Sequence, residues 1–217
     1  RANIGREWTD AEMLAHRKQT EAAKEKRQAD KLRLQVDAKA QASKDWASAT
    51  PADPANPYLQ RKGIQPHGVR EKPDYNGDPA LRIPMFDGNE LWNIQTVYGD
   101  GTKAFSRGGR VSGCFCPIGV SDSAEVVCIA EGFATAATVY EATGFPTYCA
   151  FNAGNLPKVA QAVRVLHPDA KIIVCGDDDW QTDGNTGKTK AKEAADAIFG
   201  RAVFPSFGND RDEDGDT

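Results

Sequence analysis

Two short apolar stretches that end in carboxylates decide the fold of this chain: VVCIAEG at residues 126–132 and KIIVCGDDD at residues 171–179. Each is long enough for one buried strand, and each precedes a segment with helical character. A third apolar stretch, PTYCAF, lies between them at residues 146–151. Because ligands of parallel sheets bind beyond the carboxyl ends of the strands, we expect Glu131 and the aspartates at 177–179 to share one functional edge.

The sequence from residue 124 onward alternates between expected strands and expected helices. The strands are expected near 125–130, 146–151, 171–176 and 201–205, and the helices near 133–143, 156–166 and 188–199. The strands are continuous apolar runs, which is typical of a parallel sheet covered by helices on both faces. We therefore predict an α/β, Rossmann-like domain over residues 124–217. Asn155 is expected to cap the second helix, and Pro157 suits its first turn.

The preceding residues predict two further parts. Residues 9 to about 48 contain no Gly or Pro and open on a capping box, Thr9 to Glu12, so we expect a long solvated helix within residues 1–50. Its basic residues are candidates for a nucleic-acid or partner contact, although mixed-charge helix faces are more often simply solvated. A proline-rich break follows. Strands expected at 81–86, 91–98 and 103–105 then predict a small α+β subdomain over residues 51–123.

Composition excludes several classes of protein. The net charge is −4 and the pI is near 5.5, so any nucleic-acid contact requires a local basic patch. Cys128, Cys149 and Cys175 lie inside apolar runs, as expected for buried thiols in a reducing cytoplasm. Cys114 and Cys116 are too close for half of an ordinary zinc site. No apolar run approaches a membrane span, so we expect no membrane partner. The terminal residues lead us to expect a piece of a longer polypeptide.

The carboxylates themselves point to a hard cation. Asp177 and Asp179 point the same way in an extended segment and can share one ion. Like charges at neighbouring strand ends repel one another unless a divalent ion neutralises them, and Glu131 adds such a charge. Oxygen ligands favour Mg²⁺ or Mn²⁺ over zinc, and these ions serve phosphoryl transfer. The alternative for the aspartates is a polar turn between strand and helix.

The order of the acidic residues excludes related phosphate-handling folds. A response-regulator receiver has its acidic pair after the first strand and a single Asp later, which is the reverse of the order here. A haloacid-dehalogenase-type phosphatase has its Asp-x-Asp motif after the first strand. The segment GNTGKT at 184–189 lacks the four-residue gap of a nucleotide P-loop.

The ordered motifs resemble the Toprim domain shared by bacterial-type primases, topoisomerases and some nucleases. Ala130-Glu131-Gly132 ends one strand, and the Gly176 to Asp179 segment follows two strands later. Upstream, PYLQRKGI at 57–64, IPMFDG at 83–88 and GGR at 108–110 are similar to primase motifs. The stretch FNAGNL at 151–156 is similar to primases fused to helicases on plasmids, phages and integrated elements. The resemblance covers residues 57–217.

This resemblance implies a set of site residues. Glu131, Asp177 and Asp179 would be the catalytic metal ligands, and Asp178 is a further candidate. Asp214 and Asp216 in the acidic tail are also candidate ligands, with a solvated tail as the alternative. The candidate contacts for template or triphosphate are basic: Arg61, Lys62, Lys103, Arg107, Arg110 and Lys188. For some of them a hairpin turn, or screening of the carboxylates, is the alternative.

The function implied by the resemblance is that of a DNA primase catalytic core. Such a core is a nucleotidyltransferase with DNA-directed RNA polymerase activity, here serving replication of a mobile element. It would use Mg²⁺ or Mn²⁺, nucleoside triphosphates and a single-stranded DNA template, with a fused or associated replicative helicase as partner. The zinc module and the third, helical part of cellular primases are absent from this sequence. The alternatives are a Toprim-type nuclease using the same carboxylates, and a non-catalytic module that binds DNA or a helicase.

Overall fold

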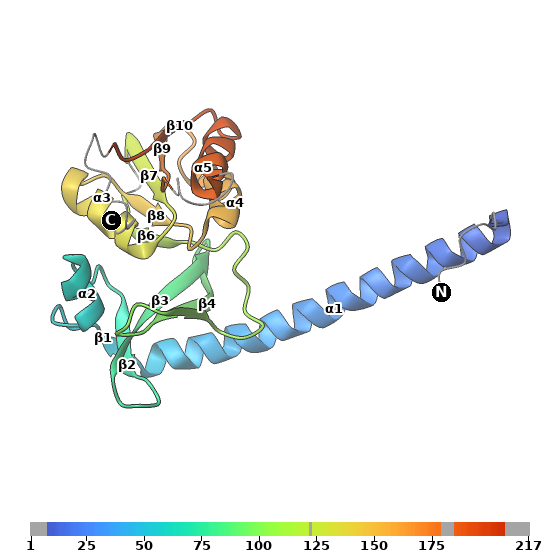
Figure 1. Ribbon diagram of the computed structural model, residues 1–217, viewed down its shortest axis with the longest axis horizontal. Helices are drawn as coiled ribbons and strands as arrows, with labels where there is room; N and C mark the ends of the chain where they lie inside the picture. Colours follow the sequence, from blue (N-terminus) through green and yellow to red (C-terminus); the bar gives the residue numbers. More distant parts are fainter. Residues whose placement is uncertain (1–7, 122, 179–184, 207–217) are drawn as a thin grey trace.

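The computed structural model describes residues 8–121, 123–178 and 185–206 (Figure 1). Within these residues the chain forms two five-stranded sheets and a long helix that extends beyond them. None of the described helices is long and apolar enough to cross a bilayer. The α/β class and the long N-terminal helix are therefore confirmed.

Helix α1 (Asp10–Ser48) begins at the capping box that the sequence predicts. The Thr9 hydroxyl accepts a hydrogen bond from the Glu12 backbone N–H at 3.3 Å, and the Glu12 carboxylate accepts one from the Thr9 N–H at 2.9 Å. The 39 residues span about 58 Å at 1.5 Å per residue. Only Ala38 and Ala42 are buried, because only the last third of the helix packs on the small sheet. The remainder projects away from the body (Figure 1).

The small sheet is antiparallel, with strands in the order β1-β2-β3-β4-β5. Its strands are β1 (Thr50–Pro51), β2 (Arg70–Pro73), β3 (Pro79–Asp87), β4 (Glu90–Val97) and β5 (Lys103–Phe105). The sequence predicts β3, β4 and β5, but not β1, β2 or the short helix α2 (Pro57–Lys62). Asp45 ties α1 to this sheet, since its two carboxylate oxygens lie 3.0 Å from Arg82 Nε and 3.0 Å from Lys72 Nζ.

The second sheet has the order β10-β9-β7-β8-β6 and is mixed rather than wholly parallel. Strands β7 (Val126–Ala130), β8 (Thr147–Cys149), β9 (Lys171–Cys175) and β10 (Arg201–Val203) run parallel to one another. This confirms the parallel arrangement of the four expected strands, and one further strand that the sequence does not predict, β6 (Cys116–Ile118), pairs antiparallel with β8 at the edge. This short strand lies before the expected start of the domain at residue 124.

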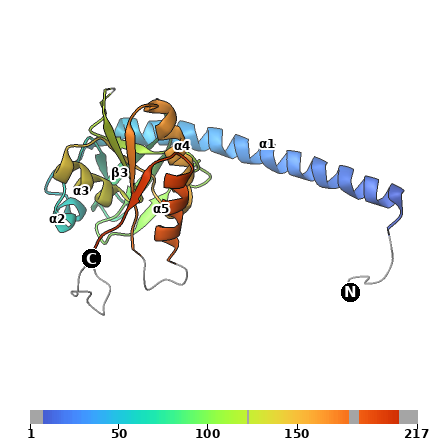
Figure 2. The ribbon, with the colours of Figure 1, turned by 90° about the horizontal axis from the view of Figure 1, so that it is seen from above.

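Helices cover both faces of the second sheet, as predicted. Helix α3 (Phe133–Thr143) lies on one face, while α4 (Leu156–Leu166) and α5 (Thr186–Asp196) lie on the other (Figure 2). The α3 face shares its apolar core with the small sheet: Phe133 and Ala136 join the same buried cluster as Leu81 and Ile83. The two sheets are also joined where the Phe86 and Phe115 backbones exchange two hydrogen bonds of 2.8 Å. The division at residues 50 and 123 stays a prediction.

Asn155 does not cap α4 as expected. It ends the short 3-10 helix η1 (Ala153–Asn155), and its side chain is 4% exposed. The side-chain oxygen accepts a hydrogen bond from the Gly113 N–H at 2.7 Å, and the amide donates to the carbonyls of Cys114 and Ala150, both at 2.9 Å. The cap prediction fails because these partners lie up to 42 residues away in sequence. Asn155 instead fastens the segment between the two sheets to the end of β8.

Candidate active site

Two of the predicted carboxylates follow paired positions of adjacent parallel strands. In the register of β7 and β9, Ala130 lies opposite Cys175. Glu131 comes directly after Ala130, and Asp177 comes two residues after Cys175. The strands thus deliver both side chains to the same edge, as the sequence predicts. Both residues are half-buried.

The pKa of the Cys149 thiol, at the end of β8, is influenced by several charged groups near this edge. This pKa is raised to about 12, mainly by burial and to a smaller extent by the charges of Glu131 and Asp177. A hydrogen bond from the Phe151 backbone and the positive charge of Lys103 act in the opposite direction. Lys103 belongs to β5 of the small sheet. Lys103, Glu131 and Asp177 therefore all lie within electrostatic range of the same thiol.

Phe105 reaches the same edge from β5, two residues after Lys103. Its ring makes a T-shaped contact with Phe151, with ring centroids 6.2 Å apart. Phe151 follows β8, is 7% exposed and has a φ of 72°, an uncommon conformation for a bulky residue. Phe105 itself is 38% exposed. The sequence analysis did not single it out, although its period-2 spacing from Lys103 is the signal that places both side chains on one face of β5.

Asp178 is held by the start of α5. Asn185, the N-cap of that helix, donates from Nδ2 to Asp178 Oδ1 at 2.6 Å and accepts a hydrogen bond from the Lys188 N–H at 3.2 Å. Its φ of 40° lies in the left-handed region, which Asn tolerates better than most residues. The Lys188 ammonium lies over the Phe204 ring, 5.4 Å from its centroid. The structure thus gives Asp178 a role in anchoring this turn.

The remaining predicted acidic ligands, Asp179, Asp214 and Asp216, lie outside the described residues. Within 8–121, 123–178 and 185–206, no group of three or more His, Cys, Asp or Glu side chains is arranged to hold a metal ion. The donors that are described at the edge, Glu131 and Asp177, are carboxylates. Hard divalent cations such as Mg²⁺ prefer oxygen ligands of this kind, so the residues present fit such an ion by their chemistry.

Apart from Lys188, which lies over the Phe204 ring, the predicted basic residues fall into two groups. Arg61 and Arg110 are engaged within the fold. Arg61 donates to the Gly99 carbonyl at 2.6 Å, and Arg110 forms an ion pair with Asp87 at 2.8 Å. The other group comprises the exposed side chains of Lys62, Lys103 and Arg107, which make no ion pair with any described residue. The second group retains its charge for a ligand, whereas the first is largely occupied by structural contacts.

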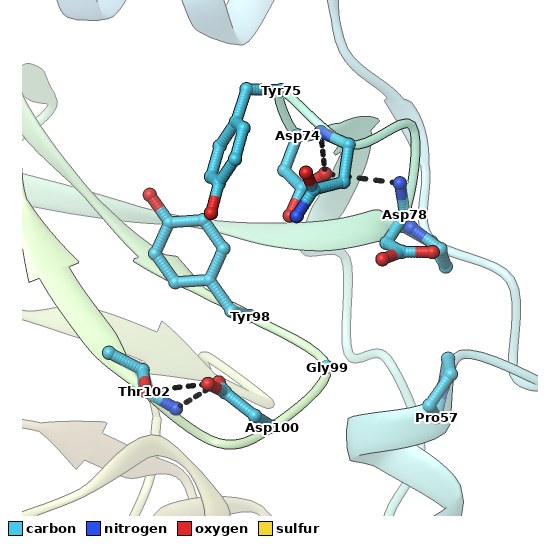
Figure 3. Close-up of a pocket in the computed structure, with 10 residues that line it drawn as sticks. Pro57, Asp74, Tyr75, Asp78, Tyr98, Gly99, Asp100 and Thr102 are labelled. Carbon is cyan, nitrogen blue, oxygen red and sulfur yellow. Dashed lines mark hydrogen bonds between the residues drawn. The ribbon is translucent and has the colours of Figure 1, made fainter.

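A cavity of about 440 Å³ lies elsewhere, among the turns of the small sheet (Figure 3). Tyr75 and Tyr98 face it, together with the carboxylates of Asp74 and Asp100. Two hydrogen bonds from Thr102 hold the pKa of Asp100 below its usual value, and Asp74 accepts from the backbone at Asn76 and Asp78. These carboxylates stabilise their own turns. Among the predicted site residues that the structure describes, none lines the cavity.

Comparison with known proteins identifies similar domains and sequences. Residues 126–215 match the Toprim domain family. A DNA primase TraC of Escherichia coli is 42% identical over 196 residues, which are 86% of this chain and 18% of that protein. A second DNA primase TraC of Escherichia coli is 42% identical over 173 residues, or 76% of this chain and 12% of that protein. The chain thus spans less than a fifth of the length of either relative.

The fold also matches a solved structure, that of the DnaG primase catalytic domain bound to single-stranded DNA. The TM-score is 0.50 at 10% identity, over 86% of this chain and 77% of that one. At this low sequence identity, the match is evidence for the fold alone. Residues 126–215 thus match the Toprim domain family, and most of the chain is similar to a segment of two bacterial DNA primases.

Proposed function

We propose that this chain is the catalytic core of a DNA primase, a nucleotidyltransferase that makes short RNA primers on single-stranded DNA. The observation that carries the proposal is the register of β7 and β9, which brings Glu131 and Asp177 to one edge, in a chain similar to DNA primases over most of its length. The ends of β7 and β9 supply two carboxylates, and β5 supplies a cation from the facing sheet. This pairing suits a site that holds metal ions on one side and phosphates on the other.

Each of the chain's own site residues would have a separate role. Glu131 and Asp177, with Asp179 of the same motif, would hold divalent ions, Mg²⁺ or Mn²⁺. Such ions, when bound, lower the pKa of an attacking 3′-hydroxyl and stabilise charge on the transferring phosphoryl group. Lys103 would contact the triphosphate or the template backbone. Asp178 would orient the loop by its hydrogen bond to Asn185 rather than by binding an ion. Phe105 offers an apolar face to a base.

The proposed partners follow from the same site. Nucleoside triphosphates and a single-stranded template would meet at the carboxylate edge. A replicative helicase, fused or associated, would complete the assembly in replication of a mobile element. The five cysteines are free, and four of them are buried, which suits a reducing cytoplasm.

The decisive experiment is template-directed oligoribonucleotide synthesis on single-stranded DNA with Mg²⁺ or Mn²⁺. We expect synthesis by the parental chain and its loss in Glu131→Gln and Asp177→Asn, with the circular dichroism spectrum unchanged. The same strands offer matched controls at their opposite ends: Glu125→Gln before β7 and Asp169→Asn before β9. Both controls should stay within twofold of the parental rate.

Two outcomes would contradict the proposal. Primer synthesis at the parental rate by Glu131→Gln or Asp177→Asn would remove the catalytic assignment. Metal-dependent nicking of DNA without nucleotides, lost in the same two variants and accompanied by no primer synthesis, would show a nuclease instead.

A further inference from the structure

Helix α1 continues its packing face beyond the body of the protein, and there the face becomes basic. Ala38 and Ala42 are buried against the small sheet. Arg17, Lys24, Arg27 and Lys31 fall on the same side of the helix as these alanines, within a sector of about 80° at 3.6 residues per turn. We call these four residues the basic face of α1. All four are exposed.

The charge on this side is locally positive although the whole chain carries a net charge of −4. Between residues 10 and 35 the sector itself contains these four cations and no carboxylate, while Asp10, Glu12, Glu21 and Asp30 lie beside it, Asp30 within the groove described below. The opposite side mixes Lys18, Lys26 and Arg33 with Glu25. Among the described residues, none of the four basic side chains makes an ion pair with a neighbour. A local excess of charge of this kind suits a polyanion.

The basic face leads into a groove against the second basic segment of the protein. A cavity of about 400 Å³ lies between α1 and the turn after β5, and is lined by Arg27, Asp30, Lys31, Leu34, Gln35, Gly108 and Gly109. Gly108 has a φ of 75° and packs against Leu34 of the helix, where an added Cβ would lie 3.6 Å from the Leu34 Cβ. The turn is therefore held close to α1 at the point where the basic face begins.

A short segment of the chain leads from the candidate active site to the groove. Lys103 lies at the carboxylate edge, Arg107 is exposed two residues after β5, and Gly108 and Gly109 reach α1. Residues 103–109 thus connect Lys103, a predicted phosphate contact, to the groove beside the helix. Beyond the groove, the basic face from Lys31 to Arg17 extends for about 21 Å along the helix axis.

We propose that the basic face of α1 binds the phosphate backbone of the single-stranded DNA template as it passes the groove beside Gly108. The choice of this partner rests on the proposed function. The contact is electrostatic and independent of sequence, because flexible Lys and Arg side chains on a solvated helix contact phosphates without reading bases. With this contact, the DNA-binding surface would extend from the carboxylate edge to the projecting part of the helix.

The test compares two quadruple variants with the same change in net charge. The first replaces the basic face: Arg17→Gln, Lys24→Gln, Arg27→Gln and Lys31→Gln. The second replaces basic residues on the opposite side: Lys18→Gln, Lys26→Gln, Arg33→Gln and Lys44→Gln. Glutamine is a good helix former, so both variants should keep the helix, which circular dichroism checks. Binding of a labelled thymidine oligonucleotide of about 30 nucleotides is measured by fluorescence anisotropy over a range of salt concentrations.

We expect the first variant to bind about tenfold more weakly or worse in 0.1 M salt. The slope of log affinity against log salt should fall by about 3, since each phosphate contact on a single strand contributes about 0.7. The opposite-side variant should stay within twofold of the parental chain. Equal losses in both variants would show only a general charge effect and would overturn the proposal. Unchanged binding by the first variant would overturn it as well.

The titration is carried out in EDTA and without nucleotides, so it does not depend on catalysis. A chain that bound DNA through the basic face but made no primers would refute the proposed function and leave this proposal intact. If the parental chain made primers and the two variants bound DNA equally well, the proposed function would stand and the present proposal would be refuted.

Discussion

Replacing Asn155 by Ala should destabilise the protein by removing three hydrogen bonds at once. The side chain is 4% exposed and joins Gly113 and Cys114 to Ala150, so no solvent replaces the lost partners readily. A hydrogen bond contributes about 0.5–1.5 kcal/mol net, and leaving a buried group unsatisfied costs about 1–3 kcal/mol. We therefore expect a loss of about 3 kcal/mol in the free energy of unfolding. For a chain of this length that corresponds to a decrease in Tm of about 6–12 °C.

The assay is urea unfolding together with scanning calorimetry. Asn152→Ala is the matched control, because that side chain is half-buried and accepts one hydrogen bond, from the Asn155 N–H at 3.0 Å. It should cost about 1 kcal/mol. Asn155→Asp should be at least as harmful as Asn155→Ala, since it would point carboxylate oxygens at two carbonyls. An Asn155→Ala protein no less stable than Asn152→Ala would refute the reasoning.

Three further outcomes are expected. Burial raises the pKa of Glu141, but hydrogen bonds from the loop at residues 65–67 lower it more, so its pKa in the folded protein is below the usual value. The decrease in Tm caused by Glu141→Gln should therefore be constant from about pH 7 to about pH 5 and should shrink below about pH 4. A decrease in Tm that did not depend on pH would contradict this. Phe105→Ala should raise the KM for nucleotide or template about fivefold or more if a base stacks there, while Phe105→Trp should not; an unchanged KM would remove that role. In Gly109→Ala the new Cβ would lie 2.3 Å from the buried Asn93 amide, so thermal unfolding should show a loss of about 1–3 kcal/mol, and unaltered stability would show that the amide can move aside.

The elements that the sequence predicts well are those whose signals are local. Strands β7 and β9 are continuous apolar runs, and the carboxylates follow directly in the chain, so Glu131 and Asp177 could be assigned to one edge without a structure. The start of α1 was equally visible, because a capping box involves residues only three apart. The family match over residues 126–215 agrees with that assignment of the fold.

The elements that escaped prediction depend on contacts between distant residues. Strands β1 and β6 have two and three residues, too few for a periodic pattern, and they form only because a partner strand is present. The cap expected of Asn155 failed because tertiary partners competed for its amide. The placement of Lys103 beside the carboxylates follows from packing between the two sheets, and the engagement of Arg110 by Asp87 depends on a partner 23 residues away in sequence. Motif spacing contains none of this information.

Because α1 is long and uninterrupted, it fixes both the distance and the rotation of its first residues relative to the small sheet. With no Gly or Pro between Asp10 and Ser48, the helix is expected to turn as one rod about its anchorage at Asp45. Residue 10 stands about 42 Å along the axis from residue 38, where burial begins. Removing seven residues from the exposed part would shorten this distance by about 10 Å and rotate its end by only about 20°, whereas removing two would rotate it by about 160°. The described start of the helix is thereby held at both a distance and an angle from the small sheet.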